Sequence, residues 1–297
     1  MKKGLMIAGG VALILGAAGV ATIQGLAGDA ASAADTVYGA QAMASEFSPA
    51  GVAQSASAKL HLSQEQRAQI KKILKAEKPQ AGPAVHELAS AWKEVQALTS
   101  SGNADASEIR AAIDKEQPAV ATLIVEAART KTTIYNEVLT PSQREAAKGI
   151  FADVDGRLTK RLDNIPSVAD RLVKMASWKL NLTDSQQEQI RSLVDAGVKH
   201  DLPLIKELAN ERLAIQSATA DGAFDEGQVR KLAEAPAKTA TELAGDAAVL
   251  KTQVFAVLTP AQRKQVAAFQ AQMKNHRAAR FHRFFPNFPG TEHGRDI

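Results

Sequence analysis

The chain has 297 residues, of which 45% are hydrophobic, 23% charged and 4% aromatic, and it contains no cysteine. This length allows about two domains, and the hydrophobic content is high enough for buried cores, which excludes a disordered protein. The lack of cysteine excludes a disulfide framework, a cysteine-ligated metal, a thiol nucleophile and a lipoprotein anchor. Because Ala, Gln, Leu, Lys and Glu recur throughout, we expect an all-α protein.

Positive charge is concentrated at the two ends of the chain. The formal net charge is +4, and loss of residues 1–33 would remove two lysines and one aspartate, which leaves +3. From Gln270 onward, five lysines and arginines stand against two acidic residues, so this end alone carries +3. The body between the ends is therefore close to neutral, which argues against nucleic acid as a partner.

The N-terminus has the layout of a secretory signal. Two lysines precede an apolar stretch over residues 5–20, and small residues follow as far as Ala33. This pattern predicts a signal peptide over residues 1–33, cleaved from an exported chain. Because no charged residue lies between Lys3 and Asp29, an uncleaved membrane anchor is the alternative.

A six-residue phrase occurs four times, as LSQEQR at 62–67, LTPSQR at 139–144, LTDSQQ at 182–187 and LTPAQR at 258–263. In each copy the Ser or Thr is suited to be an N-cap that accepts from the backbone N–H three residues on, while the Gln at that position reaches back to the cap. Proline at the first helical position of two copies also suits a helix start. We therefore interpret these boxes as helix-capping motifs, with ligand contact by the same side chains as the alternative. The residues concerned are Leu62, Ser63, Gln66, Leu139, Thr140, Gln143, Leu182, Thr183, Gln186, Leu258, Thr259 and Gln262.

The boxes belong to a longer internal repeat. A shift of 120 positions superposes Leu62 on Leu182, and many residues between the boxes match at the same shift. Self-similarity of this kind predicts two tandem units, over residues 47–160 and 167–281, each with one box near its start and one near its end.

Two further segments flank the units. Residues 34–46 are predicted to be a linker, and residues 282–297 a basic, aromatic and flexible tail. Phenylalanines are interleaved with Arg280 and Arg283 where the second unit ends and this tail begins. Contact of the tail with the body of the protein, or with anionic lipid, is the alternative to a free end.

Apolar spacing predicts the helices of the first unit. One helix should run from Ser63 to about Lys78, and a second should end near Leu98 after a break at the prolines of residues 78–83. A long third helix is expected over residues 106–138, and a fourth should begin at the following box. At 1.5 Å per residue the third helix would be ~48 Å long, which suits an elongated hairpin.

The second unit should repeat this arrangement, with an additional helix over residues 168–180 leading into it. We expect Pro118 and Pro236 to bend the long helix of each unit. We expect Trp92 and Trp178 to pack against other helices, because each stands in an amphipathic stretch. Alternating steps of four and three give the long helix of the second unit a coiled-coil-like seam, formed by Leu243, Ala247, Leu250, Val254 and Val257.

Paired LTxxQ boxes in an exported, cysteine-free, Ala- and Gln-rich helical chain resemble the Spy/CpxP family of periplasmic proteins, which includes zinc-resistance-associated relatives. The resemblance covers nearly all of the exported chain. It implies elongated helical hairpins that pair into a curved cradle, and an ATP-independent chaperone or envelope-stress role. The duplication departs from the single unit that the resemblance implies. Pairing can therefore occur within one chain, as a pseudo-dimeric monomer, or between chains, as a homodimer.

The sequence contains no recognisable catalytic constellation. The HEL sequence at residues 86–88 lacks the second histidine of a zinc protease, and phosphate loops, dinucleotide fingerprints and nucleophile elbows do not occur. We therefore predict a protein that is not an enzyme and needs no cofactor. No metal site is predicted, because histidine positions are not repeated: His61 corresponds to Asn181, and His200 to Gln80.

These observations lead us to expect a periplasmic, ATP-independent chaperone. Its partners would be unfolded or misfolded envelope proteins, bound on a concave amphipathic surface by charged side chains for encounter and apolar ones for retention. An envelope-stress signalling modulator and a metal-responsive periplasmic protein are the alternatives. Proximity to the membrane would follow from an uncleaved N-terminus or from the basic tail.

Overall fold

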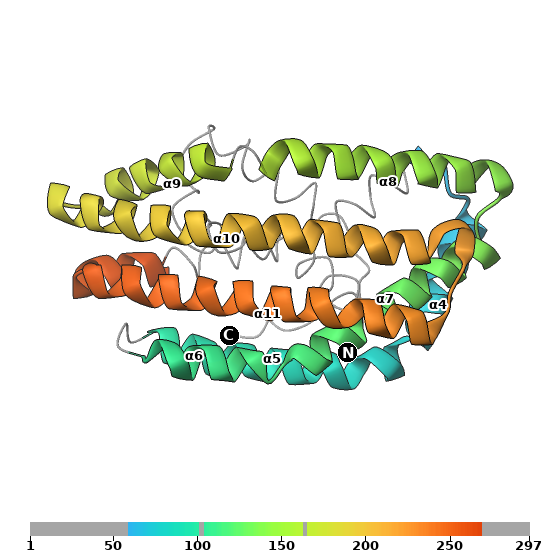
Figure 1. The fold of residues 1–297 in the computed structure, drawn as a ribbon, viewed down its shortest axis with the longest axis horizontal. Helices are drawn as coiled ribbons and strands as arrows, with labels where there is room; N and C mark the ends of the chain where they lie inside the picture. The colour runs from blue at the N-terminus through green and yellow to red at the C-terminus, as the bar shows by residue number, and fades with distance from the viewer. Residues whose placement is uncertain (1–58, 101–103, 163–164, 269–297) are drawn as a thin grey trace, which may run out of the picture.

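A computed structural model describes residues 59–100, 104–162 and 165–268 (Figure 1). The regular elements within these ranges are helices, which confirms the all-α prediction. None of the helices in these ranges combines the length and the apolar character needed to cross a membrane. The predicted signal peptide, linker and tail lie outside the described residues.

The described residues of the first unit form five helices. They are α4 (Gln64–Ala76), α5 (Lys78–Ser100), α6 (Ala106–Asp114), α7 (Gln117–Glu137) and α8 (Pro141–Leu162). The second unit begins with α9 (Ile165–Leu180) and continues with α10 (Asp184–Ala218), the short 3-10 helix η3 (Ala220–Gly222), α11 (Glu226–Val257) and a helical segment over residues 260–268. The predicted helix over residues 168–180 corresponds to α9.

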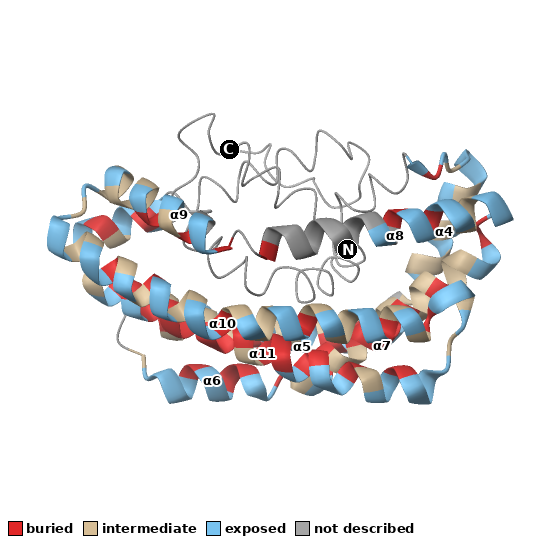
Figure 2. Ribbon diagram, turned by 45° about the horizontal axis from the view of Figure 1, so that its top comes forward, coloured by how far each residue is buried: buried red, intermediate tan, exposed pale blue. Residues whose placement is uncertain are grey.

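The molecule is an elongated helical body. The long helices α10 and α11 lie side by side along its centre, with α8 and α9 along one edge and α5 and α6 along the other (Figure 1). The body is curved, because α9 rises at one end and α4 at the other (Figure 2). Buried positions line the contacts between α5, α7, α10 and α11, where the main core lies.

The two units share this core. Leu123 of α7 and Leu243 of α11, which correspond to each other in the repeat, are 1% and 0% exposed and belong to one cluster of buried residues. A second shared cluster joins Ile109 and Ile113 of α6 to Val249 of α11. Since neither unit buries its apolar face alone, the chain forms an intramolecular pseudo-dimer.

The tip of the second hairpin is held by the first unit. Asn136 Nδ2 donates to the Gly222 carbonyl at 2.8 Å, and Lys148 Nζ lies 2.6 Å from an Asp221 carboxylate oxygen. Gly222 has a φ of 82°, and a Cβ there would lie 2.0 Å from Asn136 Oδ1. Only glycine fits this contact. The contacts with Asn136 and Lys148 place the tip of the second hairpin beside the box at residues 139–144 of the first unit.

The break between the first two helices differs from the prediction. It falls at Glu77, before the prolines, and α5 begins at Lys78 with Pro79 in its first turn and Pro83 inside it. The prediction of a break throughout residues 78–83 was wrong. A proline near a helix start loses no intrahelical hydrogen bond through its missing N–H, so Pro79 is compatible with the start of α5.

The two long helices that were predicted to bend at a proline differ in continuity. In the first unit the expected helix is interrupted at Lys115 and Glu116, and Pro118 stands in the first turn of α7. In the second unit α11 passes through Pro236, and α10 through Pro203, without interruption. Leu243, Leu250 and Val254 of the predicted seam are buried, whereas Ala247 and Val257 are half-buried.

Candidate functional site

All four boxes begin a helix with the same local hydrogen bonds. At the first box, Gln66 N donates to Ser63 Oγ at 3.2 Å, and Ser63 N donates to Gln66 Oε1 at 3.0 Å. The reciprocal pattern is repeated by Thr140 with Gln143, Thr183 with Gln186 and Thr259 with Gln262. Each capping box therefore provides acceptors for two backbone N–H groups that would otherwise lack a partner at the helix start.

The two boxes of a unit are also joined to each other. Gln66 Nε2 donates to Gln143 Oε1 at 2.7 Å, and Gln143 Nε2 donates back to Gln66 Oε1 at 3.0 Å. Their remaining N–H groups donate to Val138 O at 2.8 Å and Leu60 O at 3.0 Å. We call this arrangement the first glutamine pair.

The second unit repeats the arrangement in the second glutamine pair, formed by Gln186 and Gln262. Gln186 Nε2 donates to Gln262 Oε1 at 2.9 Å, and Gln262 Nε2 donates to Gln186 Oε1 at 3.2 Å. Val257 O and Leu180 O accept the remaining bonds. Because a glutamine amide has two donors and one oxygen that accepts two bonds, each of these four amides is fully used. These four glutamines thus have no spare donor for a ligand.

The arginine at the end of a box completes the motif. Arg67, Arg144 and Arg263 each donate Nε to the carbonyl of the leucine that opens their own box, at 3.2, 3.1 and 3.1 Å. The box over residues 182–187 ends in glutamine instead. The opening leucines pack at the helix starts, where Leu139 and Leu258 are buried and Leu62 and Leu182 half-buried. Sequence reasoning found the caps but missed both the glutamine pairs and these arginine bonds.

The residue before each unit's first box has a left-handed backbone. His61 and Asn181 correspond in the repeat and have φ values of 47° and 48°. Asparagine and histidine are enriched in this conformation among residues other than glycine. After Asn181, Leu182 N donates to Ser177 O at 3.0 Å, the bond that closes a helix whose next residue is left-handed. These positions therefore have a conformational role.

The expectation that both tryptophans pack against other helices was wrong. Trp92 on α5 is 55% exposed and Trp178 on α9 is 71% exposed. In an α-helix, adjacent residues point about 100° apart, so Trp92 lies beside the face on which Ala91 and Val95 are buried. Leu213 of α10 is the third large hydrophobic side chain that is exposed among the described residues. These side chains are candidates for contact with a partner.

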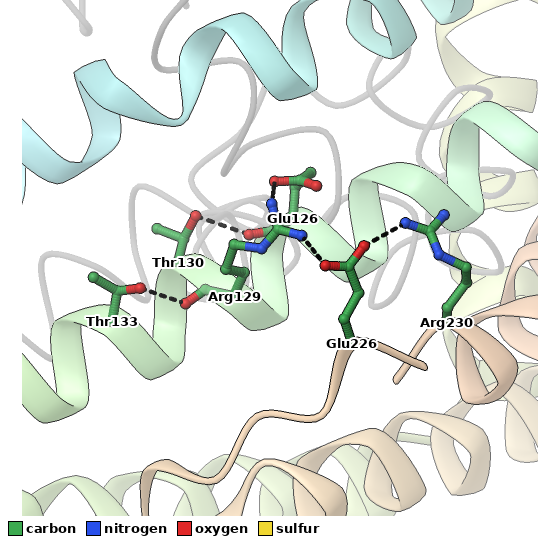
Figure 3. A network of polar contacts seen from close by, with 6 residues as sticks. All are labelled: Glu126, Arg129, Thr130, Thr133, Glu226 and Arg230. Carbon is green, nitrogen blue, oxygen red and sulfur yellow. Dashed lines mark hydrogen bonds and ion pairs between the residues drawn. The ribbon is translucent and has the colours of Figure 1, made fainter. Parts of the chain in front are cut away.

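A series of ion pairs connects the first unit to the second (Figure 3). Arg129 of α7 lies 3.1 Å from Glu126 and 2.7 Å from Glu226, at the start of α11. Glu226 in turn accepts from Arg230 at 2.7 Å. Burial raises the pKa of Glu126, and the neighbouring Arg129 opposes this effect. The network neutralises a buried carboxylate and links the two units.

A second acidic cluster lies between α10 and α11. Asp201 and Asp246 are buried, the exposed His200 lies beside them, and Arg110 of α6 makes an ion pair with Asp246 Oδ1. Burial, reinforced by the negative charge of Asp246, raises the pKa of Asp201 to about 6. Sequence reasoning missed this cluster, although one signal was available: Asp201 occupies the position of Ala81, a core residue of the first unit.

Comparison with known proteins agrees with the repeat. The sequence profile described as LTXXQ motif family protein matches residues 50–151 and residues 169–270. No curated protein and no solved structure matches the chain. The two matches cover most of the chain, contain the four boxes and confirm the predicted family resemblance with two tandem units. The chain therefore belongs to the LTXXQ motif family.

Proposed function

We propose that the chain acts in the periplasm as an ATP-independent chaperone that binds unfolded or misfolded envelope proteins and limits their aggregation. The observation that carries this proposal is the exposure of Trp92 and Trp178 on a body that has already buried its own core. Exposed indole rings offer large contact areas to apolar segments of another chain, and they also tolerate water. Such side chains suit transient contacts with many sequences.

Charged side chains accompany both tryptophans. Lys93 and Glu94 follow Trp92 on α5, and both are exposed. On α9, Lys174 lies one turn before Trp178 and makes an ion pair with Asp170 at 2.8 Å. Exposed charges accelerate encounter with charged segments of a client, and the indoles then prolong the contact.

The periplasmic location rests on the family and on the N-terminal sequence. Export with cleavage after Ala33 would give a mature chain that begins at Ala34. Intact-mass measurement of the exported protein tests this. A species that keeps Met1 and remains in the membrane fraction would show that the N-terminus is an anchor.

Aggregation of a chemically unfolded model protein tests the chaperone activity. We expect residues 34–297 to suppress light scattering by the client at near-equimolar ratio, without ATP and without added metal. Raising the salt concentration above the screening range should slow capture of the client before it weakens the apolar contacts, because the encounter is electrostatic. Unchanged aggregation in several-fold excess of the protein, at low and moderate salt, would overturn the proposal and favour the envelope-stress signalling modulator.

A matched pair of variants tests the role of the tryptophans. The double variant Trp92→Gln and Trp178→Gln keeps good helix formers at exposed positions and should suppress aggregation less than the wild type. The control places glutamine at two exposed serines of the same helices, Ser90 and Ser167, and should act like the wild type. Equal activity of both double variants would exclude these tryptophans as the contact surface.

A further inference from the structure

We propose that His200, Asp201 and Asp246 form a binding site for one divalent transition-metal ion, a role that goes beyond the proposed chaperone function. One side-chain ligand atom from each of the three residues lies within 4.8 Å of the others. His200 and Asp201 are neighbours on α10, and Asp246 approaches from α11. The site therefore spans the central pair of long helices.

The state of the two carboxylates points to a missing partner. Asp201 and Asp246 are 6% and 8% exposed. Asp201 Oδ1 and Asp246 Oδ2 are buried, and neither accepts a hydrogen bond. Buried carboxylate oxygens are costly to leave without a partner, and a cation between the two would satisfy both.

The ion pair between Arg110 and Asp246 leaves one Asp246 oxygen for a metal. Arg110 contacts Oδ1 of Asp246, whereas Oδ2 accepts no hydrogen bond, so the ion pair with Arg110 and a metal can use different oxygens. His200 Nε2 already lies 3.3 Å from that Oδ2. Two ligands of one zinc ion, each at about 2.1 Å, are at most about 4.2 Å apart. Rotation of the exposed His200 side chain adjusts the distances from its imidazole to the two carboxylates.

The donor set defines the class of ion. One imidazole with two carboxylates suits Zn²⁺ and neighbouring transition metals, in contrast to the all-oxygen shells of Ca²⁺ and Mg²⁺. Three protein ligands also leave one tetrahedral position for water, and the exposure of His200 gives solvent access to that position.

The first unit provides an internal comparison, because it lacks this donor set. The positions of His200, Asp201 and Asp246 are occupied there by Gln80, Ala81 and Glu126. Ala81 supplies no ligand, and Glu126 is engaged with Arg129. Among the described residues, only the second unit therefore offers this site, and one high-affinity ion is expected in each chain.

Calorimetric titration of the metal-free protein with Zn²⁺ tests the proposal. The wild type should bind one ion with high affinity. Asp201→Asn and His200→Gln should each weaken this binding by more than the roughly 10- to 100-fold that follows loss of an outer-sphere partner. His86→Gln alters another exposed histidine and should bind like the wild type.

Two further measurements keep the result independent of folding defects. Asp201→Asn removes like-charge repulsion at nearly constant shape, so circular dichroism should show unchanged helix content. Zn²⁺ should raise the unfolding temperature of the wild type, because it binds the folded state, and should raise that of Asp201→Asn much less. The absence of high-affinity binding, or equal affinity in wild type and Asp201→Asn, would overturn the site and identify the pair as two carboxyls that share a proton.

Discussion

The two units have closely related sequences, yet their long helices differ in continuity. In the second unit, α10 and α11 each run without interruption, whereas the equivalent stretches of the first unit are divided at Glu77 and at Lys115 and Glu116. Both units nevertheless keep the same glutamine pair and contribute to the same core. The boxes and the core positions thus set the fold, and helix continuity can vary around them.

Individual residues explain the difference at the first break. Pro79 stands where the second unit has Lys199, and a proline at this position cannot donate to the carbonyl of Lys75. Proline also disfavours the helical conformation of the residue before it. Pro236, in contrast, is fully buried inside the continuous α11. The effect of a proline therefore depends on the packing around it.

The mass of the protein in solution tests whether the two units of one chain pair with each other. We expect light scattering coupled to size exclusion to report the mass of one chain. The apolar faces of α7 and α11 already cover each other, and tethering keeps the units at millimolar effective concentration. A value of twice the chain mass, stable on dilution, would show that pairing between chains persists.

Truncation of the shared core should have the largest effect on stability. Leu123→Ala and Leu243→Ala should each lower the free energy of unfolding by about 2–5 kcal/mol, because each leaves a cavity in one common cluster. Denaturant unfolding should remain a single transition in both variants. Leu213→Ala, at an exposed position, is the control and should change little. Two separate transitions, only one of them shifted in each variant, would contradict a shared core.

Substitution of a paired glutamine should have the next largest effect on the free energy of unfolding. Gln262 is buried, whereas Gln143 is half-buried, so Gln262→Ala should cost about 2 kcal/mol and Gln143→Ala less. Chemical denaturation measures both values. Gln189→Ala removes an exposed glutamine of α10 and serves as the control. If that control cost as much as Gln262→Ala, the pairing would have no special role in stability.

The features that sequence reasoning predicted correctly are local or periodic. The fold class and the burial of Leu243, Leu250 and Val254 follow from spacing along one helix. A capping box likewise lies within four consecutive residues, so it can be recognised in a single sequence. None of these inferences depends on how the helices pack together.

The features that it missed depend on the register between distant helices. The pairing of Gln66 with Gln143 and the approach of Asp201 to Asp246 require the hairpins to be aligned, which a single sequence does not specify. The exposure of Trp178 was not predicted, for a related reason. An amphipathic pattern gives the faces of a helix, but a residue at the border of two faces is buried or exposed according to its neighbours.

The smallest predicted effect concerns the break at Glu77. Pro79→Lys introduces the residue that the second unit has at the equivalent position, and it restores a donor for the Lys75 carbonyl. The new hydrogen bond is offset by the greater freedom of the unfolded chain, so stability should change by less than about 1 kcal/mol. Amide hydrogen exchange should nevertheless slow around residues 77–80, toward the protection of residues 197–200 in the continuous α10, which is the internal reference. Unchanged exchange around Glu77 would show that the packing of α4 against α7, and not Pro79, imposes the break.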